Sequence, residues 1–146
     1  MSLKTALHQY LASKASITAL VPASRIVRGK RPVGAALPSI AYFRVTGASE
    51  QHQASAGDFA TDLVQFDIWA VTDTSADAIR DAIRNVLDGM HNTKIGSGAN
   101  ATAILSCEIV NNTDVIEFPD DGSDAHRFCA SMDCEIKYRV SVPNFT

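Results

Sequence analysis

The four histidines of this sequence are the first residues to consider for chemistry, because an imidazole can bind a metal ion or transfer a proton near neutral pH. They occupy positions 8, 52, 91 and 126, and no two of them have a spacing that would by itself build a zinc site. His126 begins a long segment of alternating apolar and polar residues, so we interpret it as a residue at the end of a strand. The histidines therefore indicate neither a metal centre nor a general base.

A nucleophilic serine or cysteine needs a nearby base and a pocket that stabilises an oxyanion. The sequence contains no G-x-S-x-G motif. Its three cysteines, Cys107, Cys129 and Cys134, lack the spacing of a metal site, and an odd number of cysteines without a signal peptide favours reduced thiols in a cytosolic setting. Cys134 falls among positions predicted to face the core, so we interpret it as a packing residue.

Three short polar segments contain residue types that could bind an ion. GSGAN, at residues 96–100, lacks the lysine of a P-loop and opens no evident helix, which favours a flexible connection. Asp120, Asp121 and Asp124 could bind a hard cation, but the calcium-loop pattern with its final glutamate is missing, which favours an acidic turn. RIVRGKR, at residues 25–31, has no interleaved aromatic residues, so we interpret it as a solvated connection or a protein interface.

Contact with a partner is the role that fits two other features. Trp69 lies on the mixed face of its predicted strand, and tryptophan is favoured at interface hot spots, although it could instead pack beneath the N-terminal segment. Residues 47–58, GASEQHQASAGD, contain no large aliphatic or aromatic side chain and are predicted to form a long loop between two strands. The candidate partner-contact residues are Gln51, His52, Gln53 and Trp69.

The composition excludes several classes of protein. A length of 146 residues predicts a single domain over residues 1–146, and an apolar fraction of 46% is ordinary for a soluble globular protein. The net charge of -3 gives no overall basic surface for nucleic acid or anionic membrane. No window approaches the roughly 20 apolar residues of a membrane span, and polar residues interrupt the N-terminal MSLKTALHQYLASK, which excludes a secretory signal.

The elements that must position these residues follow from the spacing of apolar side chains. One face of an N-terminal helix would carry Leu3, Leu7, Tyr10 and Leu11. SITALV, from Ser16, predicts a short second helical turn, and the glycines and prolines of RGKRPVGAALP predict an irregular connection. Alternating side chains then predict a strand over residues 39–46.

The clearest pattern is a strand followed by a helix between residues 62 and 90. The dry face of the strand would carry Val64, Phe66, Ile68 and Ala70. Thr74 and Asp77 fit a helix-capping pattern, and Gly89 suits the helix exit. The apolar face of the helix would carry Ala76, Ile79, Ile83, Val86, Leu87 and Met90, and its polar face would pair Asp77 with Arg80, Asp81 with Arg84 and Arg84 with Asp88.

The C-terminal part of the sequence predicts further strands. ILSCEIV and DVIEF read as two strands separated by Asn111 and Asn112, and residues 126–142 read as one strand long enough to bend, bulge or project beyond the sheet. The order of elements predicts an α+β fold. We expect a mostly antiparallel sheet with the N-terminal helix and the central amphipathic helix packed on one face.

These segments also resemble a known family. GAALPSIAYFRV, VQFDIWA, TSADAIRDAIRNVLDG and HRFCASMDCEIKYRV occur in the order seen in small proteins from the tail gene clusters of long-tailed bacteriophages and prophages. Those proteins are called tail completion, tail terminator or tail-to-head joining proteins. VQFDIWA with its following helix is the most specific part of a resemblance that covers nearly the whole chain, and the family has no catalytic residues to transfer.

The resemblance implies a structural role with no catalysis and no cofactor. Such proteins form a ring, usually of six copies, at the head-proximal end of the virion tail, where the ring caps the tail tube, stops its polymerisation and joins it to the head. The expected partners are other copies of the chain, the major tail tube protein and the head–tail connector or stopper protein. DNA passes through the ring channel, no membrane is involved, and assembly takes place in the cytoplasm of the bacterial host.

Residues 47–58 would then become ordered in the ring or against the tube. Two alternatives to this function remain. The first is a head-closure or adaptor protein of the same particle. The second is a small ligand-binding α+β domain that uses GSGAN and the PDDGSD turn.

Overall fold

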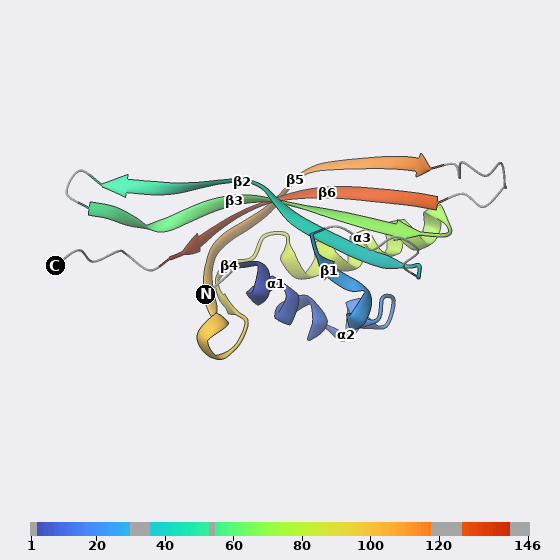
Figure 1. Ribbon diagram of the computed structural model, residues 1–146, viewed down its shortest axis with the longest axis horizontal. Helices are drawn as coiled ribbons and strands as arrows, with labels where there is room; N and C mark the ends of the chain where they lie inside the picture. The colour runs from blue at the N-terminus through green and yellow to red at the C-terminus, as the bar shows by residue number, and fades with distance from the viewer. Residues whose placement is uncertain (1–2, 30–35, 53–54, 118–126, 141–146) are drawn as a thin grey trace.

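The computed structural model describes residues 3–29, 36–52, 55–117 and 127–140 (Figure 1). Its helices are α1 (Leu3–Ala12), α2 (Ala15–Thr18) and α3 (Asp73–Leu87), and two 3-10 turns cover Ala23–Arg25 and Gly98–Asn100. Its strands are β1 (Ile26–Arg28), β2 (Ser39–His52), β3 (Ser55–Ala70), β4 (His91–Ile95), β5 (Thr102–Glu117) and β6 (Arg127–Arg139).

The strands form one sheet in the order β1-β2-β3-β6-β5-β4. β1 runs parallel to β2, and the other neighbouring pairs are antiparallel. The predicted mostly antiparallel sheet is therefore confirmed, with the correction that the sheet is mixed. The sequence did not predict β1 or β4, because strands of three and five residues are too short to show a clear alternation, and four of the five residues of β4 are exposed.

The helices lie on one side of this sheet (Figure 1). Val64, Phe66, Ile68 and Ala70, the predicted dry face of β3, are each 0% exposed. They share a core with Leu7 and Leu11 of α1 and with Ile79, Ile83 and Leu87 of α3. Because side chains alternate along a strand and recur every three or four residues along a helix, these spacings bring two apolar surfaces together.

The start of α3 differs from the prediction by two residues. The capping residue is Thr72, whose side-chain oxygen accepts a hydrogen bond of 3.1 Å from the backbone N–H of Ser75, and Thr74 lies inside the first turn. Two predicted ion pairs are confirmed, Asp77 with Arg80 at 2.7 Å and Arg84 with Asp88 at 3.5 Å. Gly89 follows the helix with a φ of 81°, a conformation that favours glycine, as its predicted place at the exit implies.

The prediction of a long loop over residues 47–58 is wrong. β2 continues to His52 and β3 begins at Ser55, and their register pairs Gly47 with Asp62 and Gln51 with Ala56. Small and polar side chains cannot build a core, which is why the segment read as a loop. They do not prevent backbone hydrogen bonds between two strands, and the segment forms the end of a hairpin.

The prediction of two strands separated at Asn111 and Asn112 is also wrong. β5 is continuous, and the irregularity is a register shift against β6 between Ile109 and Asn111. Such a bulge inserts one residue without ending the strand. The predicted C-terminal strand is present as β6, and His126 lies outside the described residues.

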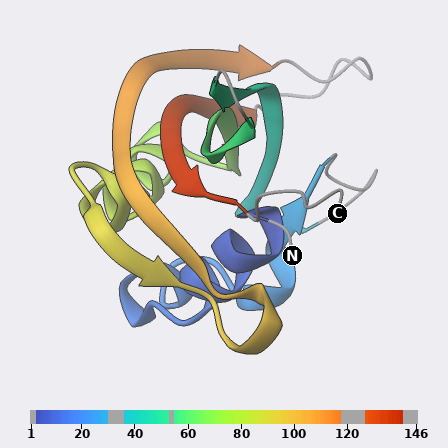
Figure 2. The same cartoon turned by 90° about the vertical axis from the view of Figure 1, so that its left-hand side faces the viewer.

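The two long hairpins extend in opposite directions (Figure 1). The last pair between β3 and β6 is Phe59 with Arg139, so the β2–β3 hairpin continues beyond the end of β6. At the other end, β5 and β6 remain paired as far as Glu117 and Arg127. Figure 2 views the molecule from the end that carries the β2–β3 hairpin. In this view β5 curves around β6, and the sheet is strongly twisted.

Candidate functional site

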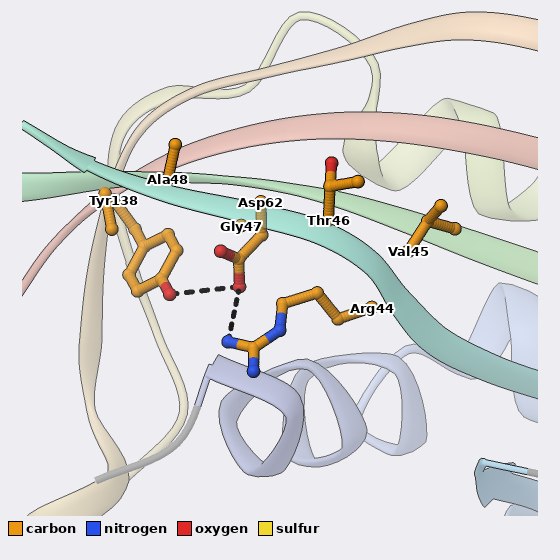
Figure 3. A pocket seen from close by; sticks show the side chains of 8 residues that line it. Arg44, Val45, Thr46, Gly47, Ala48, Asp62 and Tyr138 are labelled. Carbon is orange, nitrogen blue, oxygen red and sulfur yellow. Dashed lines mark hydrogen bonds and ion pairs between the residues drawn. The ribbon is translucent and has the colours of Figure 1, made fainter.

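The only buried carboxylate among the described residues belongs to Asp62, which is 4% exposed. Asp62 lies on β3 where the β2–β3 hairpin leaves the body of the protein, opposite Gly47 of β2 and Ile136 of β6. Figure 3 shows the side chains of Arg44 and Tyr138 directed at it from the two neighbouring strands. These residues line a shallow hollow of about 430 Å³.

The carboxylate of Asp62 accepts a hydrogen bond from one of these neighbours and forms an ion pair with the other. The Tyr138 hydroxyl donates a hydrogen bond of 3.0 Å to Asp62 Oδ2, and Arg44 Nη1 lies 3.7 Å from the same oxygen. Burial, together with the hydrogen bond to Asp62, raises the pKa of Tyr138 to about 12. The phenol therefore stays protonated at neutral pH and keeps donating to the carboxylate.

The backbone of Gly47 lies close to the Asp62 side chain and leaves no room for a side chain of its own. A Cβ atom added at Gly47 would lie 2.7 Å from Asp62 Oδ1, which is closer than real side chains approach. The cluster consists of a carboxylate, a guanidinium and a phenol, and the carboxylate and the phenol are hydrogen-bonded to each other. No group of three or more metal-binding side chains exists among the described residues. We interpret the cluster as a clamp that fixes β2, β3 and β6 to one another.

The predicted partner-contact residues are not brought together. Gln51 and His52 lie at the end of β2, paired with Ala56 and Ser55, whereas Trp69 lies at the opposite end of β3, paired with Ser39 and Cys129. Gln53 falls outside the described residues. Within one copy, Gln51 and His52 therefore lie at the opposite end of the β2–β3 pair from Trp69, and a partner role for these residues stays a prediction.

Trp69 belongs to the face of the sheet opposite the helices. On the same face, Asp67 Oδ1 accepts hydrogen bonds of 2.8 Å from Gln65 Nε2 and 2.7 Å from the Ser131 hydroxyl. Trp69 is half-buried beside this polar group. It does not pack beneath the N-terminal segment, because α1 lies on the other side of the sheet (Figure 1).

Most of the remaining candidates lie among the described residues. Cys134 is buried as predicted. Its hydrogen bond with Cys107 is the main cause that raises its pKa, burial raises it further, and the thiol therefore stays protonated. His8 lies 3.0 Å from the carbonyl of Ile26, and Arg28 donates a hydrogen bond of 2.7 Å to Thr5, so the basic segment packs on α1. GSGAN contains a 3-10 turn, and Asp120, Asp121 and Asp124 lie outside the described residues. No described helix is long and apolar enough to cross a membrane.

The outer edges of β2 and β5 are features that sequence reasoning missed. β1 pairs with β2 only over Ile40–Tyr42, and no described strand covers β2 from residue 43 to residue 52. β4 covers β5 up to Ser106, and backbone or side-chain hydrogen bonds then reach Cys107 and Ile109. From residue 110 to residue 117, no described strand lies on the outer side of β5.

Exposed apolar side chains gather on these two edges. Of the six large hydrophobic side chains exposed in the described residues, four lie there: Val45 on β2, and Val110, Val115 and Ile116 on β5. Val115 and Ile116 are adjacent, so both faces of β5 are apolar near its end. That pair was the available sequence signal, but it indicates a contact surface only once the sheet order shows that no described strand covers it.

The comparisons with known proteins agree with the earlier resemblance. The family model described as Tail completion protein gp17 matches residues 5–128. A chain in the solved structure "Virion of native gene transfer agent (GTA) particle" superposes with a TM-score of 0.72, covering 94% of this chain and 95% of that chain at 14% sequence identity. At that identity the likeness shows a shared fold. No curated protein matches the sequence.

Proposed function

The chain belongs to the family of tail completion proteins, and on this premise we propose that it is a structural component of a phage-type tail and not an enzyme. Its place is the head-proximal end of the tail, where a ring of copies caps the tail tube, stops its polymerisation and joins it to the head. Assembly takes place in the cytoplasm of the bacterial host.

The observation that carries this proposal is the extent of the family match. Residues 5–128 run from within α1 to the first two residues of β6, so the match rests on most of the fold and not on one motif. The strand VQFDIWA and the helix α3, which carried the resemblance in the sequence, both lie inside the matched range.

Two structural features support an assembly role. The buried polar cluster around Asp62 is paired within itself and offers no catalytic group to a substrate. In contrast, β2 and β5 have edges that no described strand covers, and these edges present backbone groups and apolar side chains that a further strand can cover. A protein with these properties is better suited to bind other proteins than to bind a small molecule.

The proposed partners are those of a ring at a tail end. They are other copies of the chain, six in a ring, the major tail tube protein on one side and the head–tail connector or stopper protein on the other. DNA passes through the channel of the ring without specific recognition, in keeping with the net charge of -3.

Deletion of the gene from a strain that produces the particles tests this function. We expect tails of abnormal length, or tails without heads, in electron micrographs, and restoration by the gene supplied in trans. Tails of normal length beside heads that have lost their DNA would indicate a head-closure protein. Infectious particles of normal form would contradict both functions.

A further inference from the structure

We propose that adjacent copies of this chain join by strand pairing, with the outer edge of β2 (residues 43–48) in one copy against the outer edge of β5 (residues 110–115) in the next. The two sheets then continue across the contact over these six residues only, because β1 covers β2 up to Tyr42 in the first copy and hydrogen bonds from the segment before β4 reach β5 up to Ile109 in the second. This inference rests on the proposed self-assembly and names the surfaces that perform it. The occupant of each edge is a second copy of the chain.

The backbone gives the first argument. An unpaired strand edge presents a row of N–H and C=O groups that readily pair with another chain, and proteins commonly protect such edges with proline or lysine. Neither residues 43–48 nor residues 110–115 contain proline or lysine. β2 and β5 run in opposite directions within the sheet, so they pair as antiparallel strands when one sheet continues into the next.

The charges of the two edges are complementary. Arg44 is the only charged residue of the β2 edge and Asp114 the only one of the β5 edge, and their side chains are 51% and 60% exposed. Arg44 pairs in register with Val64, and Asp114 pairs with Ala130, so both side chains lie on the helix side of the sheet. In a continuous sheet they can therefore stand directly opposite each other.

The existing ion pairs extend this complementarity. Within one copy, Arg44 faces Asp62 and Asp114 faces Arg80. A contact between Arg44 and Asp114 of neighbouring copies links the four side chains in the order Asp62, Arg44, Asp114, Arg80, with alternating charge. The same register places Phe43 opposite Val115 on the other face and covers one of the exposed apolar side chains.

The register also fits a closed assembly. Within one copy Arg44 lies level with Cys134 of β6, through Val64, and Asp114 lies level with Ala130, so pairing Arg44 with Asp114 shifts the next copy by four residues of β6, about 14 Å along the strands. Across the four strands β2, β3, β6 and β5 the sheet is about 19 Å wide. This ratio gives a strand tilt of about 35°, at the lower end of the roughly 35–45° range of closed barrels. Two different surfaces joined in this way can close into a ring.

Cysteine cross-linking on purified tails tests the contact. Two double variants of the full chain place cysteines at opposed positions, Phe43→Cys with Val115→Cys and Arg44→Cys with Asp114→Cys. Two more exchange the partners, Phe43→Cys with Asp114→Cys and Arg44→Cys with Val115→Cys. A shift of one residue moves a side chain to the other face of the sheet, so the exchanged pairs cannot bridge. The wild-type chain, whose three cysteines are buried, gives the background.

After mild oxidation, we expect a ladder of cross-linked copies on a non-reducing gel for the two opposed pairs and loss of that ladder for the two exchanged pairs. Each cysteine occurs once in either class, so differences in accessibility cannot produce this pattern. Equal cross-linking of all four variants, or none while electron micrographs show rings at the tail ends, overturns the strand pairing and leaves the proposed function intact. Functional tails with neither rings nor cross-links overturn both.

Discussion

Asp62 shows how a buried charge can serve architecture without chemistry. Its partners Arg44 and Tyr138 come from β2 and β6, and they are distant from it in the sequence. Sequence reasoning predicted no catalytic set, and that prediction rests on residue types and their spacing along the chain. It did not find this cluster, because three residues so far apart meet only through the register of three strands. Removing one partner from such a cluster leaves a buried group unsatisfied.

Gly47→Ala should lower the free energy of unfolding by about 1–3 kcal/mol, the usual effect of forcing extra volume into a packed site. The added methyl group would meet Asp62 Oδ1 at 2.7 Å and displace the carboxylate from its partners. Chemical denaturation measures the change. The neighbouring exposed residue provides the control, since Thr46→Ala should stay within about 0.5 kcal/mol of wild type. If Gly47→Ala changes the free energy of unfolding as little as Thr46→Ala does, the Asp62 carboxylate can be displaced without loss of stability, which would contradict its role in the clamp.

Tyr138 gives the clamp a dependence on alkaline pH. The pKa of this phenol is raised from 10.0 to about 12 in the folded protein, so its contribution to stability is fully present below about pH 10 and is lost as the pH rises through 12. Tyr138→Phe removes the hydrogen bond and the titration together. The difference in the free energy of unfolding between wild type and variant should therefore narrow from pH 8 to pH 12. A difference that stays constant with pH would contradict the raised pKa.

At the scale of elements, the sequence predicted those whose apolar residues repeat with a clear period. The dry face of β3 and the buried face of α3 are confirmed residue by residue for Val64, Phe66, Ile79 and Ile83. Residues 47–58 were misread, because period alone cannot distinguish a hairpin of small and polar residues from a loop. The short strands β1 and β4 form by pairing with β2 and β5, and their sequences show no alternation of apolar and polar residues from which they could be predicted.

Ile83→Ala tests how far α3 stabilises the sheet. Ile83 is 0% exposed in the shared core, so loss of its side chain should lower the free energy of unfolding by about 2–5 kcal/mol. Asn85→Ala, at an exposed position of the same helix, changes helix propensity by a few tenths of a kcal/mol and is the matched control. Denaturant unfolding of the two variants measures both effects. Equal values would mean that the face of α3 toward the sheet contributes little to stability.

At the scale of the whole molecule, the strand order decides what the protein exposes. The order β1-β2-β3-β6-β5-β4 places β2 and β5 next to short strands that cover only part of their length. Neither the strand order nor the pairing of the short strands β1 and β4 could be deduced from the sequence, because both depend on contacts between distant segments. The unpaired edges differ in sequence and charge, so contact between them is heterologous, and each copy carries one of each kind.

A mixing experiment follows from this asymmetry. Phe43→Glu introduces a charge on the β2 edge, and Val115→Glu introduces one on the β5 edge. Every contact in a pure sample of either variant would bury a glutamate against an apolar side chain, so each variant alone should remain a single subunit at a concentration at which the wild type assembles. In an equimolar mixture, the intact β5 edge of one variant can pair with the intact β2 edge of the other.

The second possible contact in the mixture places two glutamates directly opposite each other and is repulsive. Growth should therefore stop at a species of twice the 15.6 kDa subunit mass, measured by mass photometry. Leu20→Glu, at an exposed apolar position away from both edges, should assemble as the wild type does and controls for the added charge. Folded variants that stay separate when mixed, or a single variant that assembles alone, would contradict pairing of the two edges. If copies instead paired through the same edge in both partners, the variant altered at the other edge would keep its contact surface intact. That variant would then assemble alone.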